Sequence, residues 1–389
     1  MEELPRILIV DDEPLNIDYL EQELEDLDYE VFSARNGKEA LELVESQLPD
    51  MILLDIMMPI MDGFEVLAQL KSEKQWRDIP VVVISALSDM DNVVKGIELG
   101  AEDYLPKPFD PVLLQARIKS GLEKKRFRDL ERLYLKALER ELEIGREIQT
   151  DFLPDEIPQP EGWKIASYFQ AAREVAGDFY DVFHLDERRL GLVVGDVCDK
   201  GVGSALYMAL FRSLLRVTSD LTRFSTGLEE KSFERLLKSS VEFTNQYICS
   251  VHKSAMFASL FFGVLDPQSG SLSYINAGLD PPLIFREGKV IAELKPTGPI
   301  VGGIEDVDFK VAEAQLKPDD ILLLYTDGIT DAQSGEGEEF GRENVLAIAE
   351  EFSDSADSLI NHIVLDLEAF IESAAQFDDI TLMAVQRMG

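Results

Sequence analysis

The sequence predicts two different folds in one chain, a doubly wound α/β sheet at the front and an α+β sandwich at the back. In the first third of the chain, short apolar runs alternate with stretches whose apolar residues recur every three or four positions, which is the pattern of strands and helices in turn. In the back half, groups of strand-like runs are separated by pairs of helical stretches. A charged segment with helical spacing lies between the two patterns and predicts a linker helix.

The front pattern predicts five strands with helices between them. Amphipathic stretches at residues 14–27 and 38–45 indicate the first two helices. The expected strands are residues 6–10, 30–33, 50–54, 80–84 and 102–105. Because strand and helix alternate, we expect the strands to form one sheet that carries helices on both faces.

Acidic and polar residues stand where these apolar runs end. Asp11 and Asp12 follow the first run, Asp55 follows the third, and Ser85 and Lys107 stand where later runs end. The carboxyl ends of the strands in an open parallel sheet lie along one edge, so we expect these residues to converge on one cation and one phosphoryl group. Taken singly, Asp12 is equally suited to cap the following helix.

Together these residues resemble a known family. The motifs that carry the resemblance are Val10-Asp-Asp-Glu-Pro14, Leu54-Asp-Ile-Met-Met-Pro59, Asp62-Gly63, Ile84-Ser-Ala86 and Asp103-Tyr-Leu-Pro-Lys-Pro108. Asp62-Gly63 alone would indicate a turn. In this order and at this spacing, the motifs resemble the receiver domain of two-component response regulators over residues 1–118. The resemblance implies a flavodoxin-like fold and a sensor histidine kinase as partner.

The receiver resemblance also implies a role for each residue. Asp55 accepts the phosphoryl group, and Mg²⁺ is held by Asp11, Asp12, Asp55 and the main-chain carbonyl of Met57. The phosphoryl group is then contacted by Lys107 and Ser85, and Tyr104 rotates in response. The residue types suit this chemistry, because a carboxylate attacks an anionic donor only when a hard cation neutralises both.

Composition limits the possible functions. The chain has 389 residues, enough for two or three domains, and its formal net charge of −38 argues against a nucleic-acid or anionic-membrane surface. Two cysteines without a pairing motif favour a reducing compartment, and three scattered histidines make a histidine metal site or a Ser-His-Asp triad improbable. No segment has the length of a signal peptide or a membrane span, so we expect a cytoplasmic protein.

The segment 119–152 has the spacing of a coiled coil. Apolar residues recur at alternating intervals of three and four, with Glu141 interrupting the series, at Phe127, Leu130, Tyr134, Ala137, Ile144 and Ile148. This spacing predicts either a coiled coil, and with it a possible homodimer, or a plain amphipathic linker. In both cases the helix continues from the last helix of the front domain.

The back half, residues 153–389, predicts strands and helices in groups. Helices are expected at 203–217 and 229–249 and again before the last strand. The expected strands are 164–171, 179–185, 190–197, 256–265, 272–276, 282–285, 320–326 and 380–385. Residues 266–270, although acidic at their start, have the Pro, Ser and Gly of a hairpin turn and carry no predicted chemistry.

Five acids of this half stand beside predicted strands: Asp178, Asp196, Asp327, Asp378 and Asp379. An uncompensated charge at the edge of a core is costly. Several acids that converge there also raise one another's pKa unless cations hold them. The physical expectation is a carboxylate-rich metal site.

Six motifs around these acids resemble the bacterial branch of the metal-dependent PPM (PP2C-like) serine/threonine phosphatases, the type that regulates stress and sporulation sigma factors. They are Glu147-Ile-Gln149 with Phe152-Leu-Pro154, Ala176-Gly-Asp-Phe-Tyr-Asp181, Gly195-Asp-Val-Cys-Asp-Lys-Gly201, Asn276-Ala-Gly278 with Pro281-Pro282, Tyr325-Thr-Asp-Gly328 and Phe377-Asp-Asp-Ile-Thr381. The resemblance implies two antiparallel sheets flanked by helices. It also implies two or more Mn²⁺ or Mg²⁺ ions that activate a bridging water for attack on a phosphoserine or phosphothreonine.

By the same resemblance, the metal ligands are Asp178, Asp196, the Val197 carbonyl, Asp327 and Asp378, with Asp379 beside them. The chain departs from the family pattern at three places. Ala176 and Asp199 stand where glycine is usual, and Leu279 stands where histidine is common. None of these departures removes a ligand.

The resemblances together imply a response regulator whose output is a protein phosphatase acting on a phosphorylated anti-sigma factor antagonist in a partner-switching pathway. The direction of regulation does not follow from the sequence. An alternative from another class is a phosphorylation-dependent adaptor, in which the phosphatase fold has lost catalysis and only binds a partner.

Overall fold

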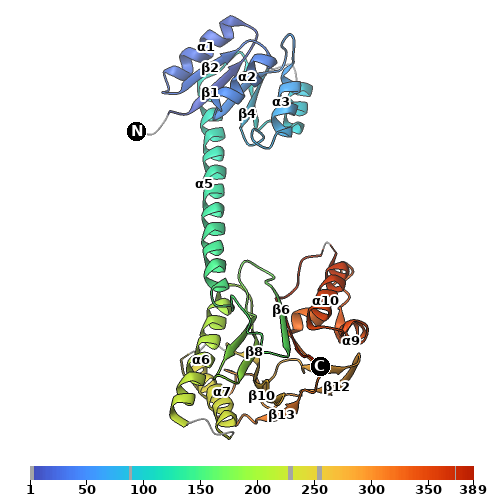
Figure 1. The fold of residues 1–389 in the computed structure, drawn as a ribbon. Coiled ribbons are helices and arrows are strands. Elements are labelled where there is room, and N and C mark those ends of the chain that lie inside the picture. The colour runs from blue at the N-terminus through green and yellow to red at the C-terminus, as the bar shows by residue number, and fades with distance from the viewer. Residues whose placement is uncertain (1–3, 87–89, 227–230, 252–255, 373) are drawn as a thin grey trace. The chain divides into compact units, whose positions relative to one another are not determined.

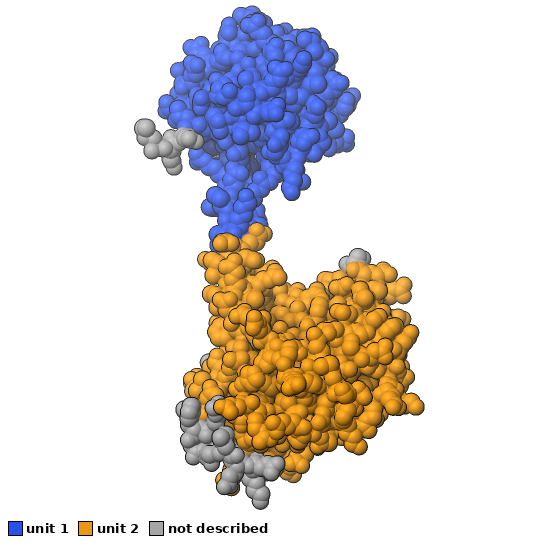
Figure 2. Space-filling model, in the orientation of Figure 1, with its two compact units in different colours: residues 1–138 blue, residues 139–389 orange. Residues whose placement is uncertain are grey.

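The structure, a computed structural model, describes residues 4–86, 90–226, 231–251, 256–372 and 374–389. The chain divides into two compact units, residues 1–138 and residues 139–389 (Figure 2). We call them the receiver unit and the phosphatase unit, after the families that their motifs resemble. The predicted helix 229–249 begins at residues outside the described part of the chain.

The receiver unit is built on one parallel sheet in the order β2-β1-β3-β4-β5. Its strands are β1 (Arg6–Val10), β2 (Glu30–Ala34), β3 (Met51–Asp55), β4 (Val81–Ala86) and β5 (Asp103–Lys107). Its helices are α1 (Pro14–Glu25), α2 (Gly37–Gln47), α3 (Gly63–Ser72), α4 (Met90–Glu98) and the first part of α5 (Pro111–Thr150). The predicted doubly wound fold is confirmed, since this strand order is that of flavodoxin-like proteins.

Alternating side chains of each strand enter two separate cores. In β1, for example, Leu8 and Val10 pack with α2 and α3, whereas Ile7 and Ile9 pack with α1 and the start of α5. Both faces of β3 are buried. A strand buried on both faces needs an uninterrupted apolar run, which explains why the strands were readable in the sequence.

Helix α5 runs without interruption from the receiver core into the linker (Figure 1). Leu114, Ile118 and Leu122 belong to the receiver core. Beyond them, Phe127, Leu130, Leu133, Tyr134, Leu138, Ile144 and Ile148 are all exposed. The predicted continuation of the last receiver helix into the linker is confirmed. Five of the exposed residues belong to the apolar series with coiled-coil spacing, which we call the seam: Phe127, Leu130, Tyr134, Ile144 and Ile148.

The phosphatase unit contains two antiparallel five-stranded sheets, in the orders β13-β10-β9-β8-β7 and β12-β11-β14-β15-β6. The first sheet consists of β7 (Phe179–His184), β8 (Leu190–Val197), β9 (Ala258–Asp266), β10 (Ser271–Ala277) and β13 (Ala312–Gln315). The second consists of β6 (Trp163–Gln170), β11 (Leu283–Arg286), β12 (Lys289–Glu293), β14 (Ile321–Tyr325) and β15 (Ile380–Arg387). The turn predicted at residues 266–270 joins β9 to β10.

Helices cover the outer face of each sheet, as Figure 1 shows. Helices α6 (Val202–Thr226) and α7 (Lys231–Val251) pack on the first sheet, and α9 (Gly341–Phe352) and α10 (Ala356–Ile371) pack on the second. A third core, which includes Phe261, Leu192 and Met383, lies between the sheets. The predicted sandwich of two antiparallel sheets flanked by helices is therefore confirmed.

Candidate functional site

The acids of the receiver unit meet at the edge formed by the carboxyl ends of the strands. Asp11 follows β1 and Asp55 is the last residue of β3, and these two strands are neighbours at the point where the strand order reverses. Oxygen atoms of Asp11, Asp12 and Asp55 all lie within 4.8 Å of one another. Three carboxylates at this spacing form a donor set that fits Mg²⁺.

Lys107 partly neutralises the receiver acids. Its Nζ atom lies 2.9 Å from Oδ2 of Asp11 and 3.2 Å from Oδ2 of Asp55. Burial, with the charge of Asp11 adding to it, raises the pKa of Asp55 to about 6, although Lys107 lowers it. One lysine among three acids leaves an excess of negative charge, and a bound cation would favour the ionised form of Asp55.

The remaining predicted receiver residues lie on neighbouring elements. Ser85 is buried in β4, which pairs with β3, and Tyr104 is half-buried in β5 with Arg117 over its ring. Met57 follows β3, and its side chain is exposed. Asn16, which no sequence motif indicated, donates hydrogen bonds from its side-chain amide to both carboxylate oxygens of Asp11.

The helix caps decide between the interpretations that the sequence left open for Asp12 and Asp62. Helix α1 begins after Glu13 without a side-chain cap, so Asp12 does not cap it. Asp62 caps α3, because its carboxylate accepts from the main-chain N–H of Glu65 while the side chain of Glu65 accepts from that of Asp62. Gly63 is required by space, since a Cβ atom there would lie 2.2 Å from the carbonyl oxygen of Asp55.

In the phosphatase unit, each sheet brings acids to the same end of the sandwich. Asp178 immediately precedes β7, and Asp196 is near the end of its neighbour β8. In the other sheet, Asp327 follows β14, and Asp378 precedes its neighbour β15. In an antiparallel pair, one strand ends beside the point where its partner begins. Each pair therefore places two acids side by side.

Two threonine hydroxyls join the sheets at Asp178. Thr326 and Thr381 each donate to Oδ2 of Asp178 at 2.7 Å. Asp178 is 2% exposed, so these hydrogen bonds fix a carboxylate that has almost no contact with water. In the sequence both threonines stand only as neighbours of acids, because a pattern does not reveal which hydroxyl faces across a sandwich.

Asp379 is held by main-chain groups. Its Oδ1 atom accepts from the N–H of Ala172 at 2.7 Å, and its Oδ2 atom accepts from the N–H of Gly177 at 2.6 Å. Both oxygens thus orient the segment that leads to Asp178. A Cβ atom on Gly328 would lie 1.8 Å from the carbonyl oxygen of Asp379, so the glycine after Asp327 permits the close approach of the two acidic segments.

The phosphatase acids are electrostatically coupled. Burial raises the pKa of Asp178 well above its ordinary value, and the charge of Asp196 raises it further. Burial also raises the pKa of Asp196 to about 6, although a hydrogen bond from Asp178 lowers it. Loss of water around Asp327 and the charges of Asp196 and Asp378 raise the pKa of Asp327 to about 7, even though part of that residue is exposed. Such shifts are those expected of buried acids that lie close to one another, and a cation among them would favour their ionised forms.

This donor set fits divalent cations by its chemistry, but it is less compact than the receiver set. Within the described residues, the group of three acids with oxygens inside 4.8 Å is the receiver group. In the phosphatase unit, Asp178 is hydrogen-bonded to Asp196, and Asp378 forms a 3.0 Å ion pair with Lys200. Oxygen-rich carboxylate sites of this kind suit Mg²⁺ or Mn²⁺.

The three departures from the family pattern are accommodated. Asp199 adopts a left-handed backbone with φ of 71°, a conformation that favours glycine but that aspartate tolerates. Leu279 is buried in the core between the sheets, and its N–H and carbonyl are bound by the side chain of Asn276. Ala176 does not require a left-handed backbone.

The end of α5 is hydrogen-bonded to the segment that precedes Asp178. Gln149, in the last turn of the helix, donates to the carbonyl of Ala176 at 2.6 Å and accepts from its N–H at 2.8 Å. Ala176 lies two residues before Asp178. The linker helix therefore contacts the segment that leads to Asp178 within the phosphatase unit.

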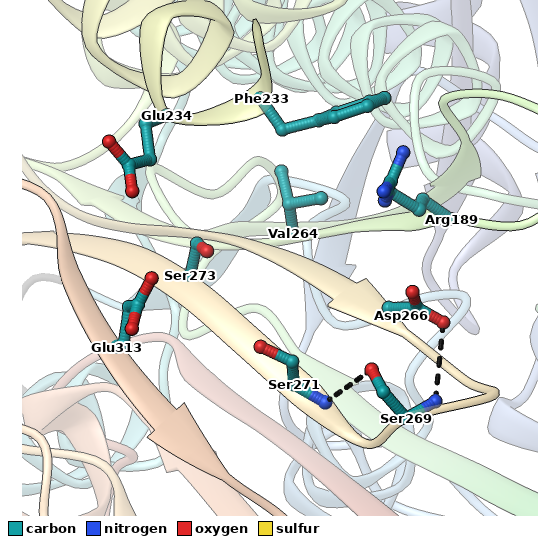
Figure 3. Close-up of a pocket in the computed structure, with 9 residues that line it drawn as sticks. All are labelled: Arg189, Phe233, Glu234, Val264, Asp266, Ser269, Ser271, Ser273 and Glu313. Carbon is teal, nitrogen blue, oxygen red and sulfur yellow. Dashed lines mark hydrogen bonds between the residues drawn. The ribbon is translucent and has the colours of Figure 1, made fainter. Parts of the chain in front are cut away.

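A separate pocket in this unit lies away from the acids. Figure 3 shows Arg189 beside the ring of Phe233, with the guanidinium 3.9 Å from the ring centroid, above Ser271 and Asp266. Arg189 precedes the start of β8, whereas Asp196 is near its end. The length of the strand separates the pocket from the acids, so the pocket is not part of the candidate metal site.

The structure also bears on the expectation about membranes. Among the described residues, no helix is both long and apolar enough to span one.

Comparison with known proteins identifies both units. The family model described as response regulator receiver domain matches residues 7–119, and the model described as Stage II sporulation protein E matches residues 186–388, more than half of the chain. The second match contains Asp196, Asp327 and Asp378 and begins after Asp178.

Individual relatives cover parts of the chain. Protein IcfG of Synechocystis sp. is 42% identical over 262 residues, which are 64% of this chain and 41% of that protein. Response regulator PleD of Caulobacter vibrioides is 49% identical over 115 residues, which are 30% of this chain and 25% of that protein. The chain thus spans less than half of either relative.

A solved structure shares the fold of the back unit. The SiaA PP2C domain of Pseudomonas aeruginosa is similar with a TM-score of 0.54 and 22% sequence identity, over 65% of this chain and 98% of that chain. At this identity the likeness concerns the fold alone.

The raised pKa values predict how pH affects stability. Asp196 and Asp327 have pKa values of about 6 and about 7 in the folded protein, whereas the ordinary value is 3.8. Between the ordinary value and these raised values, the native state binds more protons than the unfolded state. In a chelating buffer, the free energy of unfolding of the phosphatase unit should therefore fall as pH rises through that window. Saturating Mn²⁺ should remove the fall, because the ion favours the ionised acids.

Urea unfolding in a Trp76→Phe background, where Trp163 of β6 is the remaining tryptophan, measures this dependence. Asp196→Asn should flatten the pH dependence, and Asp366→Asn, at an exposed position of α10, should not. Equal slopes in both variants would contradict the assignment of the protons.

Proposed function

The chain belongs to the SpoIIE family and carries a receiver domain in front of its phosphatase domain, and we propose that it is a metal-dependent protein phosphatase for phosphoserine and phosphothreonine, controlled by phosphorylation of Asp55. The observation that carries the proposal is the meeting of acids from both sheets at one end of the sandwich, around the buried Asp178. An adaptor that had lost catalysis would not need to keep so costly a cluster of carboxylates.

In the receiver unit, Asp55 is the proposed phosphoryl acceptor. Its position at the end of β3, beside Asp11 and Lys107, supports this role. A bound Mg²⁺ supplies charge neutralisation, held by Asp11, Asp12, Asp55 and the Met57 carbonyl. Lys107 then exchanges its contact with the Asp55 carboxylate for one with the phosphoryl oxygens, and Ser85 on the adjacent strand donates a neutral hydrogen bond. A sensor histidine kinase is the proposed phosphoryl donor.

In the phosphatase unit, the proposed ligands of two Mn²⁺ or Mg²⁺ ions are Asp178, Asp196, the Val197 carbonyl, Asp327 and Asp378. When bound, such ions lower the pKa of a water molecule so that it attacks phosphorus at neutral pH. The protein's own contribution is orientation. Thr326 and Thr381 fix the Asp178 carboxylate, while Asp379 fixes the segment in front of it through the main chain.

The proposed substrate is a phosphorylated anti-sigma factor antagonist. The support for this substrate class is the family to which the phosphatase domain belongs. Its reaction is hydrolysis of a phosphoester to serine or threonine and inorganic phosphate, without a phosphoenzyme in this unit.

The exposed seam of α5 supports a homodimer. If Phe127 occupies position a of a heptad, Arg126 and Glu131 fall at g and e, which pair between parallel helices. Leu133 and Leu138 are the next such pair, and both are exposed in the single chain. Opposite charges followed by two apolar residues favour a second copy of this helix as the partner.

Asp55→Asn tests the acceptor. The variant should lose phosphoryl loading from acetyl phosphate but keep its basal metal-dependent turnover of p-nitrophenyl phosphate, because the two sites lie in different units. Intact mass spectrometry and a colorimetric assay measure the two properties. Loss of both together would contradict separate sites.

Asp327→Asn tests the catalytic acids. Removing one carboxylate charge should reduce turnover at least about a hundredfold while the chain remains folded, because the cation site loses a ligand. Turnover of a phosphoserine peptide and far-UV circular dichroism measure rate and folding. The matched variant Asp331→Asn, which changes a charge one turn away, should retain most of the rate; an unchanged rate in Asp327→Asn would sink the assignment.

Leu130→Glu tests the dimer. A charge in the seam should raise the dimer dissociation constant at least about tenfold, because two like charges would face each other across the helices. Lys136→Gln changes the net charge equally outside the seam and should have little effect. Sedimentation velocity over a concentration series distinguishes the variants, and a wild-type chain that stays monomeric throughout would rule the dimer out.

A further inference from the structure

Lys200 brings a positive charge to the acids of the phosphatase unit. It stands in the loop after β8, and its Nζ atom lies 3.0 Å from Oδ2 of Asp378. The same ammonium donates to the main-chain carbonyl of Phe377 and lies 4.3 Å from the centroid of the Phe377 ring. Three contacts therefore converge on one ammonium group, and all come from the segment that leads into β15 of the opposite sheet.

The backbone on either side of Lys200 orders the loop from which its side chain extends. Asp199 and Gly201 both have left-handed backbones, with φ of 71° and 89°, and Oδ1 of Asp199 accepts from the N–H of Lys200 at 2.9 Å. The side chains of Lys200 and Asp378 are 26% and 28% exposed. A freely exposed pair contributes little, but this one is partly desolvated and lies beside further carboxylates.

The neighbours of the pair are the proposed metal ligands. Lys200 follows Asp196 by four residues, and its charge favours the ionised form of that acid. Asp378 in turn repels Asp327. The ammonium thus lies among carboxylates from both sheets, which is also where a divalent cation would bind.

We propose that Lys200 takes the place of a divalent cation at Asp378 in the metal-free protein, so that metal binding and departure of the ammonium from Asp378 are one exchange. The inference rests on the proposed function, since it takes Asp378 as a metal ligand. An ammonium and a divalent cation repel each other at contact distance, and they compete for the same oxygen. The flexible lysine stem allows the ammonium to move aside.

The exchange sets how readily the site fills. Binding of the cation must first break the Lys200 contacts to Asp378 and Phe377, so the lysine acts as an internal competitor. Removing the ammonium should therefore tighten metal binding. A lysine that only held the loop in shape would have the opposite effect, because its loss would loosen the ligand set.

Calorimetric titration of the full chain with Mn²⁺ tests the exchange, at about pH 8, above the Asp327 pKa of about 7. Lys200→Met and Lys200→Gln should each bind Mn²⁺ at the phosphatase acids about fivefold more tightly than the wild type, the effect of one partly screened charge. Lys200→Arg keeps the charge and should remain near the wild type. Lys164→Met, which removes an exposed partner of Asp357 at the far end of β6, is the matched control.

The outcomes separate this inference from the proposed function. If the wild type takes up no Mn²⁺ beyond the ion at the receiver acids, both fall. If it takes up the additional ions but the uncharged Lys200 variants bind them with unchanged or lower affinity, the exchange is wrong and the metal site stands. Tighter binding in Lys200→Met and Lys200→Gln, with Lys200→Arg and Lys164→Met unchanged, supports the exchange.

Discussion

The repulsion between carboxylates gathered at the ends of strands is the interaction on which both units depend. In the receiver unit it arises because β1 and β3 are neighbours with the same direction, so that Asp11 and Asp55 emerge side by side. In the phosphatase unit, two antiparallel pairs from different sheets bring their acids to the same end. Folding stabilises these arrangements through apolar cores on either side, and the acids remain a local cost that a cation relieves.

Each unit reduces that cost with a lysine and with fixed hydrogen-bond donors. Lys107 bridges Asp11 and Asp55, and Lys200 contacts Asp378. Asn16 and the two threonines around Asp178 hold the carboxylates in place. The hydrogen-bond donors orient the carboxylate oxygens without neutralising them. Each site is therefore preformed and keeps an excess of negative charge.

The fold was largely readable from the sequence, because each strand that positions the acids is buried. Runs such as residues 6–10 and 321–325 lie fully or almost fully inside, so their apolar pattern is uninterrupted. The ends of the strands were harder to predict from the sequence: β3 includes Asp55, and β4 extends through Ser85 to Ala86. The sequence also indicated which acids stand at strand ends, and the structure brings four of them to one end of the sandwich.

What the sequence did not reveal are contacts made across the sandwich. The roles of Thr326 and Thr381 depend on which face of a strand they occupy, and those of Gln149 and Lys200 depend on segments far away in the chain. The glycine at 328 illustrates the limit, since Asp-Gly is a common turn, yet here the missing side chain makes room for the carbonyl of Asp379.

Anomalous X-ray diffraction at the manganese edge, from crystals of the full chain grown with Mn²⁺, tests the central claim most directly. The account predicts two manganese peaks in the phosphatase unit, in contact with carboxylate oxygens of Asp178, Asp196, Asp327 and Asp378, besides a peak at the receiver acids. Crystals that show manganese at the receiver acids but none among those four carboxylates would contradict it.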